Sequence, residues 1–395
     1  MTTRARKRSA APAAVEPHAF VVAAGPAVAA SPAAPEQTVR LHGTDFQRVM
    51  DPGTGRTQAL AGFDPEYTDI VQYIVACTHR IWEETGMGLI YTHYLHNVKV
   101  HTADGWYLGR DKVVGDSIAT KSAFPDARVT TPAVVWTGNE RDGFYTSHLI
   151  FNVSRNTGHS VYGPPTGRQV TRMGIALCLV KENLIVEEWV VRDDLSVIRQ
   201  LGLDLDATVA RLARRDAAKP PQNYGDPELQ LGQYAPEPYP APAKSGTGFE
   251  VDDFVRRSYH EIWNRRMFNL VRDVVHENML FHGPSGRECY GRGDYLALAL
   301  SLLAAFPDAR FSIDQLFWNV DEATGGWRTS MRWSLVGTHS GYGIYGAPTG
   351  VPFRLWGLTQ HVIVNGRFVE EWTVFNELAL LKRLYLARQA PPPAP

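Results

Sequence analysis

Asp193 and Asn376 are the residues whose types and positions point most directly to chemistry. Each stands four residues beyond the tryptophan of a Glu-Glu-Trp tripeptide. A carboxyl group in an apolar pocket has a raised pKa and can take a proton from a carbon next to a carbonyl, whereas an amide can orient a carbonyl but cannot titrate. We therefore predict a catalytic role for Asp193 and a substrate-binding role for Asn376. A structural alternative stays open, because Asp193 or Asp194 could cap the short helix predicted to follow.

Five histidines could assist such chemistry, since a neutral imidazole can polarise a carbonyl or hold a base in position. His101 and His282 match each other in two halves of the chain, while His148, His339 and His361 have no histidine counterpart. We predict catalytic roles for His101 and His148 and substrate-binding roles for the other three. For each of them, a hydrogen-bonded structural histidine is the alternative.

Aromatic side chains are frequent on the predicted strands. They could stack on a flat ligand, although packing in the core of a sheet is the structural alternative. An aromatic-rich interior suits an apolar small molecule. The residues that we predict to bind substrate in this way are Trp136, Tyr145, Trp189, Trp333 and Trp372.

The acidic pairs Glu187-Glu188 and Glu370-Glu371 lie on predicted strands, where successive side chains alternate between two faces. One glutamate of each pair must therefore point inward or into an interface. A buried carboxylate needs a partner, and Arg172 and Arg354 on the neighbouring hairpin strand are the candidates. The strand predicted at residues 184–192 is apolar on both faces, which is typical of a sheet covered on both sides.

The sequence suggests neither a metal nor an organic cofactor. No two His, Asp or Glu residues have convincing ligand spacing on one element. A phosphate-binding glycine loop, a Gly-x-Ser-x-Gly elbow and a Cys-His nucleophile pattern are all absent from the sequence. Cys77, Cys178 and Cys289 are widely spaced and odd in number, which favours buried thiols in a reducing compartment. We expect a cytoplasmic protein that works without a cofactor.

Length and charge narrow the class of protein further. The chain has 395 residues, a formal net charge of −1 and 44% hydrophobic residues. It is long enough for two or three domains, and its near-neutral charge gives no electrostatic reason to expect a nucleic-acid partner. No window approaches the roughly 20 apolar residues of a membrane span. The terminal segments 1–55 and 389–395 are predicted to be disordered tails.

The elements that must position the candidate residues occur twice. A Tyr-Gly-x-Pro-Thr-Gly turn and a closing Glu-Glu-Trp recur at a constant offset of 183 residues, from Tyr162 to Tyr345 and from Trp189 to Trp372. Such a repeat indicates an internal duplication. The copies are predicted to lie at 56–205 and 249–388, joined by a helix and a proline-rich linker at 206–248.

Each copy places helices before strands. The first begins with apolar residues at three-and-four spacing up to Trp82, with Asp64 as the predicted helix cap. Phe-Pro-Asp-Ala-Arg then appears at 124–128 and again at 306–310, and runs rich in β-branched and aromatic residues follow. This order indicates α+β units with antiparallel sheets.

Taken together and in order, these motifs resemble the SnoaL-like polyketide cyclase family, within the nuclear transport factor 2-like superfamily. The second half adds Gly337-Thr338-His339-Ser340-Gly341, close to the Gly-Thr-His-x-Gly run of that family. The resemblance implies two tandem cone-shaped units, each with helices packed in a strongly curved antiparallel sheet and a pocket open at one end. It also implies pairing through the outer sheet faces, so we expect an intramolecular pseudo-dimer, with a further homo-oligomer left open.

The resemblance also implies a function. In this family the Asp just after the Glu-x-Trp strand is the general acid/base of an intramolecular aldol closure, and the matching residue here is Asp193. His101 and His282 fall where a strand nears the mouth of the family's pocket. The first hypothesis is a cofactor-free enzyme that cyclises or isomerises an apolar or aromatic carbonyl compound in its first half. The alternatives are a non-catalytic binding or assembly module, which Asn376 favours for the second half, and an epoxide or ester hydrolase.

Overall fold

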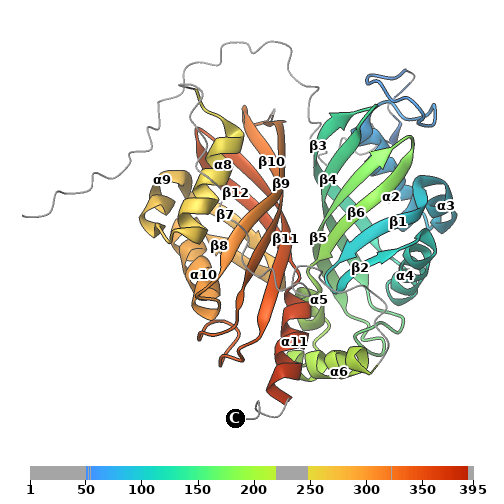
Figure 1. Cartoon of the computed structure of the whole chain (residues 1–395). Coiled ribbons are helices and arrows are strands. Elements are labelled where there is room, and N and C mark those ends of the chain that lie inside the picture. Colours follow the sequence, from blue (N-terminus) through green and yellow to red (C-terminus); the bar gives the residue numbers. More distant parts are fainter. Residues whose placement is uncertain (1–49, 52, 54, 219–247, 322, 390–395) are drawn as a thin grey trace, which may run out of the picture.

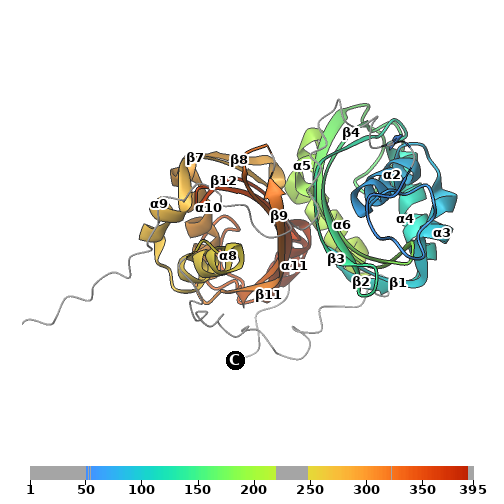
Figure 2. The same cartoon turned by 90° about the horizontal axis from the view of Figure 1, so that it is seen from above.

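The chain forms two similar units that lie against each other (Figures 1 and 2). The computed structural model describes residues 50, 51, 53, 55–218, 248–321 and 323–389. Most of the predicted tails and of the predicted linker lies outside the described residues.

The first unit is built on a six-stranded sheet with the order β2-β1-β6-β5-β4-β3. All neighbouring strands are antiparallel except β1 and β6, which run parallel. The predicted antiparallel sheet is therefore confirmed with one parallel pair added. The strands are β1 (Tyr94–Thr102), β2 (Gly105–Leu108), β3 (Arg128–Asn139), β4 (Gly143–Arg155), β5 (Gln169–Lys181) and β6 (Leu184–Arg192).

The helix α2 (Ile70–Trp82) lies inside the curve of this sheet (Figure 2). It begins later than predicted, because Asp69 rather than Asp64 caps it by accepting a hydrogen bond from the Gln72 N–H. Asp64 instead accepts a bond from the Asn183 amide. The other helices of the unit are η1 (Met87–Leu89), α3 (Ile90–His93), α4 (Arg110–Ala123), α5 (Asp194–Gln200) and α6 (Leu205–Ala217).

The second unit repeats the architecture, with a sheet in the order β8-β7-β12-β11-β10-β9 and the parallel pair β7 and β12. Its strands are β7 (Val275–Gly283), β8 (Arg287–Tyr290), β9 (Arg310–Asp321), β10 (Gly326–Thr338), β11 (Pro352–Val364) and β12 (Arg367–Phe375). Its helices are α8 (Val251–Tyr259), the π-helical turn η2 (His260–Asn264), η3 (Phe268–Leu270), α9 (Val271–Val274), η4 (Pro284–Gly286), α10 (Gly291–Ala305) and α11 (Glu377–Gln389).

The outer faces of the two sheets pack against each other, as the expected pseudo-dimer requires. Leu177 and Ile175 of the first sheet share one buried cluster with Leu358 and Phe317 of the second. Each fully buried aliphatic or aromatic side chain of this kind contributes about 1.5–3 kcal/mol. The Asn319 amide completes the interface, because it bonds both the N–H (2.9 Å) and the C=O (3.0 Å) of Trp136.

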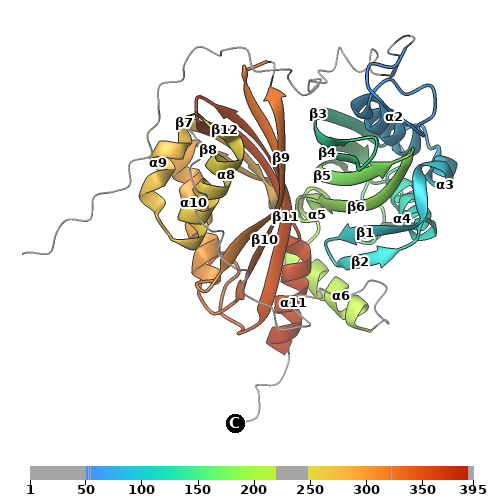
Figure 3. The same cartoon turned by 45° about the horizontal axis from the view of Figure 1, so that its top comes forward.

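A second cross-unit contact lies at one end of the molecule, where α11 meets α6 (Figure 3). The Lys382 ammonium bonds the carboxylates of Asp104 at 2.5 Å and Asp216 at 2.9 Å. Lys382 is 9% exposed, so this ion pair is better shielded from solvent than an ordinary surface pair. The two units are thus joined by an apolar sheet interface and by polar contacts at its end.

The described residues lack both a membrane-spanning helix and a cluster of metal ligands. None of the helices in the described ranges is long and apolar enough to cross a membrane. Within the same ranges, no three His, Cys, Asp or Glu side chains are grouped so that they could hold a metal ion.

Candidate functional site

Asp193 lies at the junction of the two units and lines neither of the pockets described below. Its Oδ1 accepts a hydrogen bond from the Ser196 N–H of α5, which makes it the cap of that helix. The same carboxylate accepts bonds from the Ser285 N–H at 2.6 Å and the Gly286 N–H at 3.0 Å, both in the second unit. Burial raises the pKa of Asp193, and the three N–H donors oppose that rise. Asp193 therefore has the geometry of a helix cap, which was the structural alternative to a catalytic role.

Asn376 occupies the equivalent place in the second unit and also serves the backbone. Its Oδ1 accepts a hydrogen bond from the Trp356 N–H at 3.0 Å, and its Nδ2 lies 3.4 Å from the Arg354 carbonyl. Both partners belong to β11, so Asn376 ties the end of the sheet rather than facing a ligand.

His101 and His282 lie on the outer faces of the sheets, away from both pockets. The His101 ring stacks on Trp189 at 4.9 Å and bonds the Glu187 carboxylate at 2.8 Å. The His282 ring stacks on Trp372 at 5.5 Å and bonds Glu370 at 3.3 Å and Glu288 at 2.5 Å. These matched clusters leave Trp189 and Trp372 facing the other unit rather than a pocket.

An arginine of the second unit covers each of these tryptophans. The Arg332 guanidinium lies 4.7 Å from the Trp189 ring, and that of Arg328 lies 5.0 Å from the Trp372 ring. Burial lowers the pKa of His101, whereas the hydrogen bond to Glu370 raises the pKa of His282. The contact of Arg332 with Trp189 crosses between the units, and Trp372 packs beside the same buried cluster between the sheets.

Three further predicted residues are also structural in their contacts. Trp136 packs on Phe144 within the first core, and Tyr145 packs beside the cluster between the sheets. The fully buried His339 bonds the Thr349 hydroxyl at 3.1 Å and so fixes the loop before β11. Neither pocket includes any of these side chains among its lining residues.

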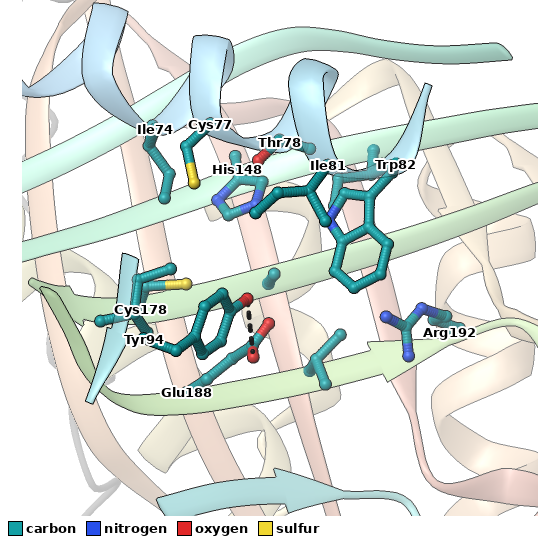
Figure 4. Close-up of a pocket in the computed structure, with 14 residues that line it drawn as sticks. Ile74, Cys77, Thr78, Ile81, Trp82, Tyr94, His148, Cys178, Glu188 and Arg192 are labelled. Atoms are coloured by element: carbon teal, nitrogen blue, oxygen red, sulfur yellow. Dashed lines mark hydrogen bonds between the residues drawn. The ribbon is translucent and has the colours of Figure 1, made fainter. Parts of the chain in front are cut away.

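A pocket that is partly open to solvent lies between α2 and the inner faces of β4, β5 and β6 (Figure 4). It brings the predicted His148 together with Glu188 and Arg192, which the sequence did not single out for this site. Two thiols, Cys77 and Cys178, also line it, and burial raises their pKa so that both stay protonated. Protonated buried thiols are poor nucleophiles.

The polar groups of this first pocket are poorly satisfied. Glu188 is 7% exposed and accepts one long bond, 3.3 Å, from the Tyr94 hydroxyl. Burial raises its pKa, against the opposing effects of Arg192 and Tyr94. His148 is 4% exposed, and burial lowers its pKa to about 4, so its ring is neutral at pH 7. Within the described part of the chain, its Nδ1 has no hydrogen-bond partner.

The second pocket, also partly open to solvent, lies between η2, α10 and the inner face of β10–β12. Its walls are aromatic and aliphatic, and the predicted Trp333 is one of them. The carboxyl of Glu371 points into this pocket from β12. The aromatic residues that share the lining are Tyr259, Trp263, Phe281, Tyr295, Phe311, Trp333 and Phe375.

Glu371 is held by hydroxyl groups. It is 4% exposed, and its Oε1 accepts a bond from the Thr373 hydroxyl at 2.6 Å while Oε2 lies 3.4 Å from the Tyr259 hydroxyl. Burial raises the pKa of Glu371 to about 7, although both hydroxyl donors lower it. A carboxyl with a pKa near the working pH can both take and return a proton.

A chain of hydrogen bonds orders the groups around Glu371. On one side, Tyr259 bonds Nε2 of the predicted His361 at 2.9 Å, and the other ring nitrogen bonds Thr329 at 2.7 Å. His361 is completely buried, and burial lowers its pKa to about 3, so it is neutral. His361 therefore positions Tyr259 and does not line the pocket.

On the other side of Glu371, the chain continues through two threonines. Thr373 bonds the Thr359 hydroxyl at 2.7 Å, and Thr359 accepts the Trp333 indole N–H at 2.9 Å. Trp333 is thus fixed both as a wall of the pocket and as the last donor of the chain. The carboxyl of Glu371 has little freedom to rotate away from the pocket.

The sequence signal for this site was the pair of adjacent glutamates. One of each pair does face inward, namely Glu188 and Glu371, but Arg172 and Arg354 are not their partners. Arg172 lies 3.6 Å from Asp194, and Arg354 bonds the Ser334 hydroxyl. In each sheet a β-bulge near the start of the last strand sets which glutamate turns inward, and the sequence alone does not reveal this bulge.

Two cones, each with a helix inside a curved sheet and a carboxyl aimed into a pocket, define a class of small-molecule-binding folds. The model of the SnoaL-like polyketide cyclase family matches this chain twice, at residues 70–201 and 253–384. The two matches cover more than half of the chain, so it belongs to the SnoaL-like polyketide cyclase family. No curated protein matches it.

Solved structures resemble one unit at a time. IdmH, a putative polyketide cyclase from Streptomyces antibioticus, is 23% identical over 34% of this chain and 99% of its own, with a TM-score of 0.30. A putative SnoaL-like polyketide cyclase from Jannaschia sp. CCS1 is 18% identical over 37% of this chain and 100% of its own, with a TM-score of 0.32. The assignment to the family rests on the sequence match.

Proposed function

We propose that the protein is a cofactor-free acid/base enzyme that isomerises or cyclises a neutral, apolar or aromatic carbonyl compound. Its active site is the second pocket, with Glu371 as the general acid/base. The observation that carries the proposal is a buried carboxyl with a pKa of about 7 at the wall of an aromatic pocket. Glu371 takes over the role that the sequence assigned to Asp193.

In the proposed reaction, the Glu371 carboxylate takes a proton from the carbon next to the substrate carbonyl, and the electron pair moves onto the carbonyl oxygen. Tyr295 lines the same pocket, and its phenol is the available donor to that enolate oxygen, because the Tyr259 hydroxyl donates to Glu371. For isomerisation, Glu371 returns the proton to a different carbon. For cyclisation, the enolate carbon attacks a second carbonyl, and the new alkoxide takes the proton from Glu371.

The pocket supports a neutral substrate rather than an anion. Among the lining residues that the structure describes, Glu371 is the acidic side chain, and no Arg, Lys or His accompanies it. An anion placed beside this carboxylate would be desolvated without a compensating cation, which is costly. Seven aromatic rings instead favour a flat apolar body.

The proposal is tested by following exchange of carbonyl-adjacent protons with deuterated water by NMR. The panel contains 2-tetralone, a β-keto ester and an aromatic diketone. Glu371→Gln should lower the exchange rate by about 10²–10⁴-fold, since an amide cannot accept the proton. Glu370→Gln is the matched control, because the neighbouring carboxylate lies on the outer face. Equal exchange by wild type and Glu371→Gln would contradict the proposal.

A non-catalytic binding module is the second candidate. The observation that favours it is the use of both Asp193 and Asn376 to hold backbone groups. In that case, the panel compounds should bind in the second pocket without any proton exchange above the solvent background. The hydrolase alternative lacks a comparable observation in its favour.

A further inference from the structure

We propose that the first pocket is a second, separate ligand site, which takes a small organic carboxylate with an apolar body and a hydroxyl or carbonyl group further along it. This inference goes beyond the proposed enzyme activity, because it concerns the other unit and other residues. It stands on two polar side chains of the pocket, His148 and Arg192.

His148 is the inner anchor of the proposed site. Its ring is almost fully buried on β4, lines the pocket, and points toward the space beneath α2 in Figure 4. Among the described residues, Nδ1 lacks a hydrogen-bond partner. A buried polar atom without a partner is destabilising, and a ligand hydroxyl or carbonyl would supply the missing hydrogen bond.

Arg192 is the outer anchor. It is an exposed residue at the end of β6, yet its side chain lines the pocket, beyond Glu188 in Figure 4. Its positive charge faces the Glu188 carboxyl of the same pocket, whose pKa it lowers. A guanidinium binds a carboxylate through two parallel hydrogen bonds, which fixes both the position and the orientation of the acid.

The pocket walls between these anchors determine the polarity and the charge of the rest of the ligand. Ile74, Ile81 and Trp82 of α2 form an apolar face that suits a hydrocarbon or aromatic body. Glu188 lies in the same pocket, so a doubly charged ligand such as a phosphate ester would meet a carboxyl group with one arginine to compensate. A ligand with one carboxylate adds less negative charge beside Glu188 than a doubly charged ligand, and Arg192 is the cation in the lining that opposes it.

The second unit shows that these anchors are not a requirement of the fold. At the constant offset of 183 residues, His148 corresponds to Met331 and Arg192 corresponds to Phe375. Phe375 lines the second pocket as an apolar wall, and Met331 is completely buried in the second core. The duplication therefore carries a charged, polar pair in the first unit and an apolar pair at the matching positions of the second.

The test is a calorimetric comparison of acids with their amides on the full-length protein. The probes are cinnamate, 4-hydroxycinnamate, 2-naphthoate and 6-hydroxy-2-naphthoate, each beside its neutral amide. We expect at least one acid to bind about tenfold more tightly than its amide, since a hydrogen bond to a charged group contributes about 1.5–3 kcal/mol. The added hydroxyl should tighten binding by a further factor of about 2–10.

Two variants test whether Arg192 causes the preference for the acid and whether His148 causes the gain from the hydroxyl. Arg192→Gln should abolish the preference for the acid over the amide. His148→Met, which installs the residue of the second unit, should abolish the gain from the hydroxyl and leave the acid preference intact. Arg141→Gln is the control, because Arg141 lies at an exposed turn of the same unit.

The proposal is overturned if no acid in the panel binds more tightly than its amide, or if Arg192→Gln keeps the preference. These outcomes are independent of proton exchange in the second pocket. A failure here therefore leaves the proposed enzyme activity untouched, and the reverse also holds.

Discussion

The two pockets share a scaffold and a glutamate but differ in how that glutamate is held. Glu371 accepts bonds from two hydroxyl groups that belong to a continuous chain from Thr329 to Trp333. Glu188, its counterpart, accepts one long bond, and its neighbour His148 has an unsatisfied nitrogen. Both copies therefore keep the cone-shaped fold. Different residues at a few inward-facing strand positions give the two pockets different chemistry.

The same positions explain the difference in charge. The first pocket has an arginine at its edge, which stabilises the ionised form of Glu188. The second has Phe375 at that place, so nothing positively charged opposes the rise in the pKa of Glu371. Burial thus raises the pKa of both carboxyls, but in the first pocket the charge of Arg192 opposes that rise.

The largest expected effect is the pH dependence of proton exchange in the second pocket. Glu371 must be ionised to take a proton, and its pKa is about 7. The rate constant at low substrate concentration should therefore rise about tenfold per pH unit up to roughly pH 6 and level off above roughly pH 8. NMR exchange rates measured from pH 5 to 9 check this. A rate constant that does not change with pH across that range would show that Glu371 is not the base.

The next effect is on stability, and it also distinguishes the two pockets. The folded pKa of Glu371 lies above the ordinary value of 4.5, so the folded state holds this proton more tightly than the unfolded state. The resulting stabilisation is complete below about pH 4.5 and is lost as the pH rises through about 7. It amounts to about 3 kcal/mol.

Urea unfolding of wild type and Glu371→Gln isolates this contribution. The free energy of unfolding of wild type, relative to the variant, should fall by about 2–3 kcal/mol between pH 5 and pH 8. The difference between proteins is the quantity to follow, because His361 has a lowered pKa and acts in the opposite direction. A difference independent of pH would mean that Glu371 is solvated or fully paired.

A smaller effect is expected at the matched residues Asp193 and Asn376. Asp193→Ala removes a helix cap and two bonds to the other unit, and should lower the free energy of unfolding by about 2 kcal/mol. Asn376→Ala removes one strong backbone bond and should cost about 1 kcal/mol. Urea unfolding at pH 7 gives both values. Equal losses would mean that the bonds from Asp193 to the second unit add nothing.

The sequence predicted the fold well because its signals are local and repeated. The apolar spacing before Trp82, the β-branched runs and the constant offset between the copies each reflect a regular element. The cap of α2 was misplaced, since Asp64 is engaged by Asn183, a residue far away in sequence. The parallel pairing of β1 with β6 is also non-local and left no sequence signal.

The surroundings of the predicted site residues also depend on contacts between distant segments. The role of Asp193 depends on η4 of the other unit, whose N–H groups reach it only when the two sheets are packed. The sequence did predict that one glutamate of each pair would face inward or into an interface, and Glu188 and Glu371 face inward. Which one does so depends on the register shift beside the pair in the last strand of each sheet, and the residue types alone do not reveal that shift.

The most direct test of the central claim is a carbon-13 NMR titration of the glutamate side chains in wild type and Glu371→Gln. We predict a carboxyl resonance that titrates near pH 7 in wild type and is missing from the variant. Such a result would establish a buried proton-transfer group in the second pocket without requiring the natural substrate. If the resonance assigned to Glu371 titrates at the ordinary value near pH 4.5, the second pocket is not an acid/base site.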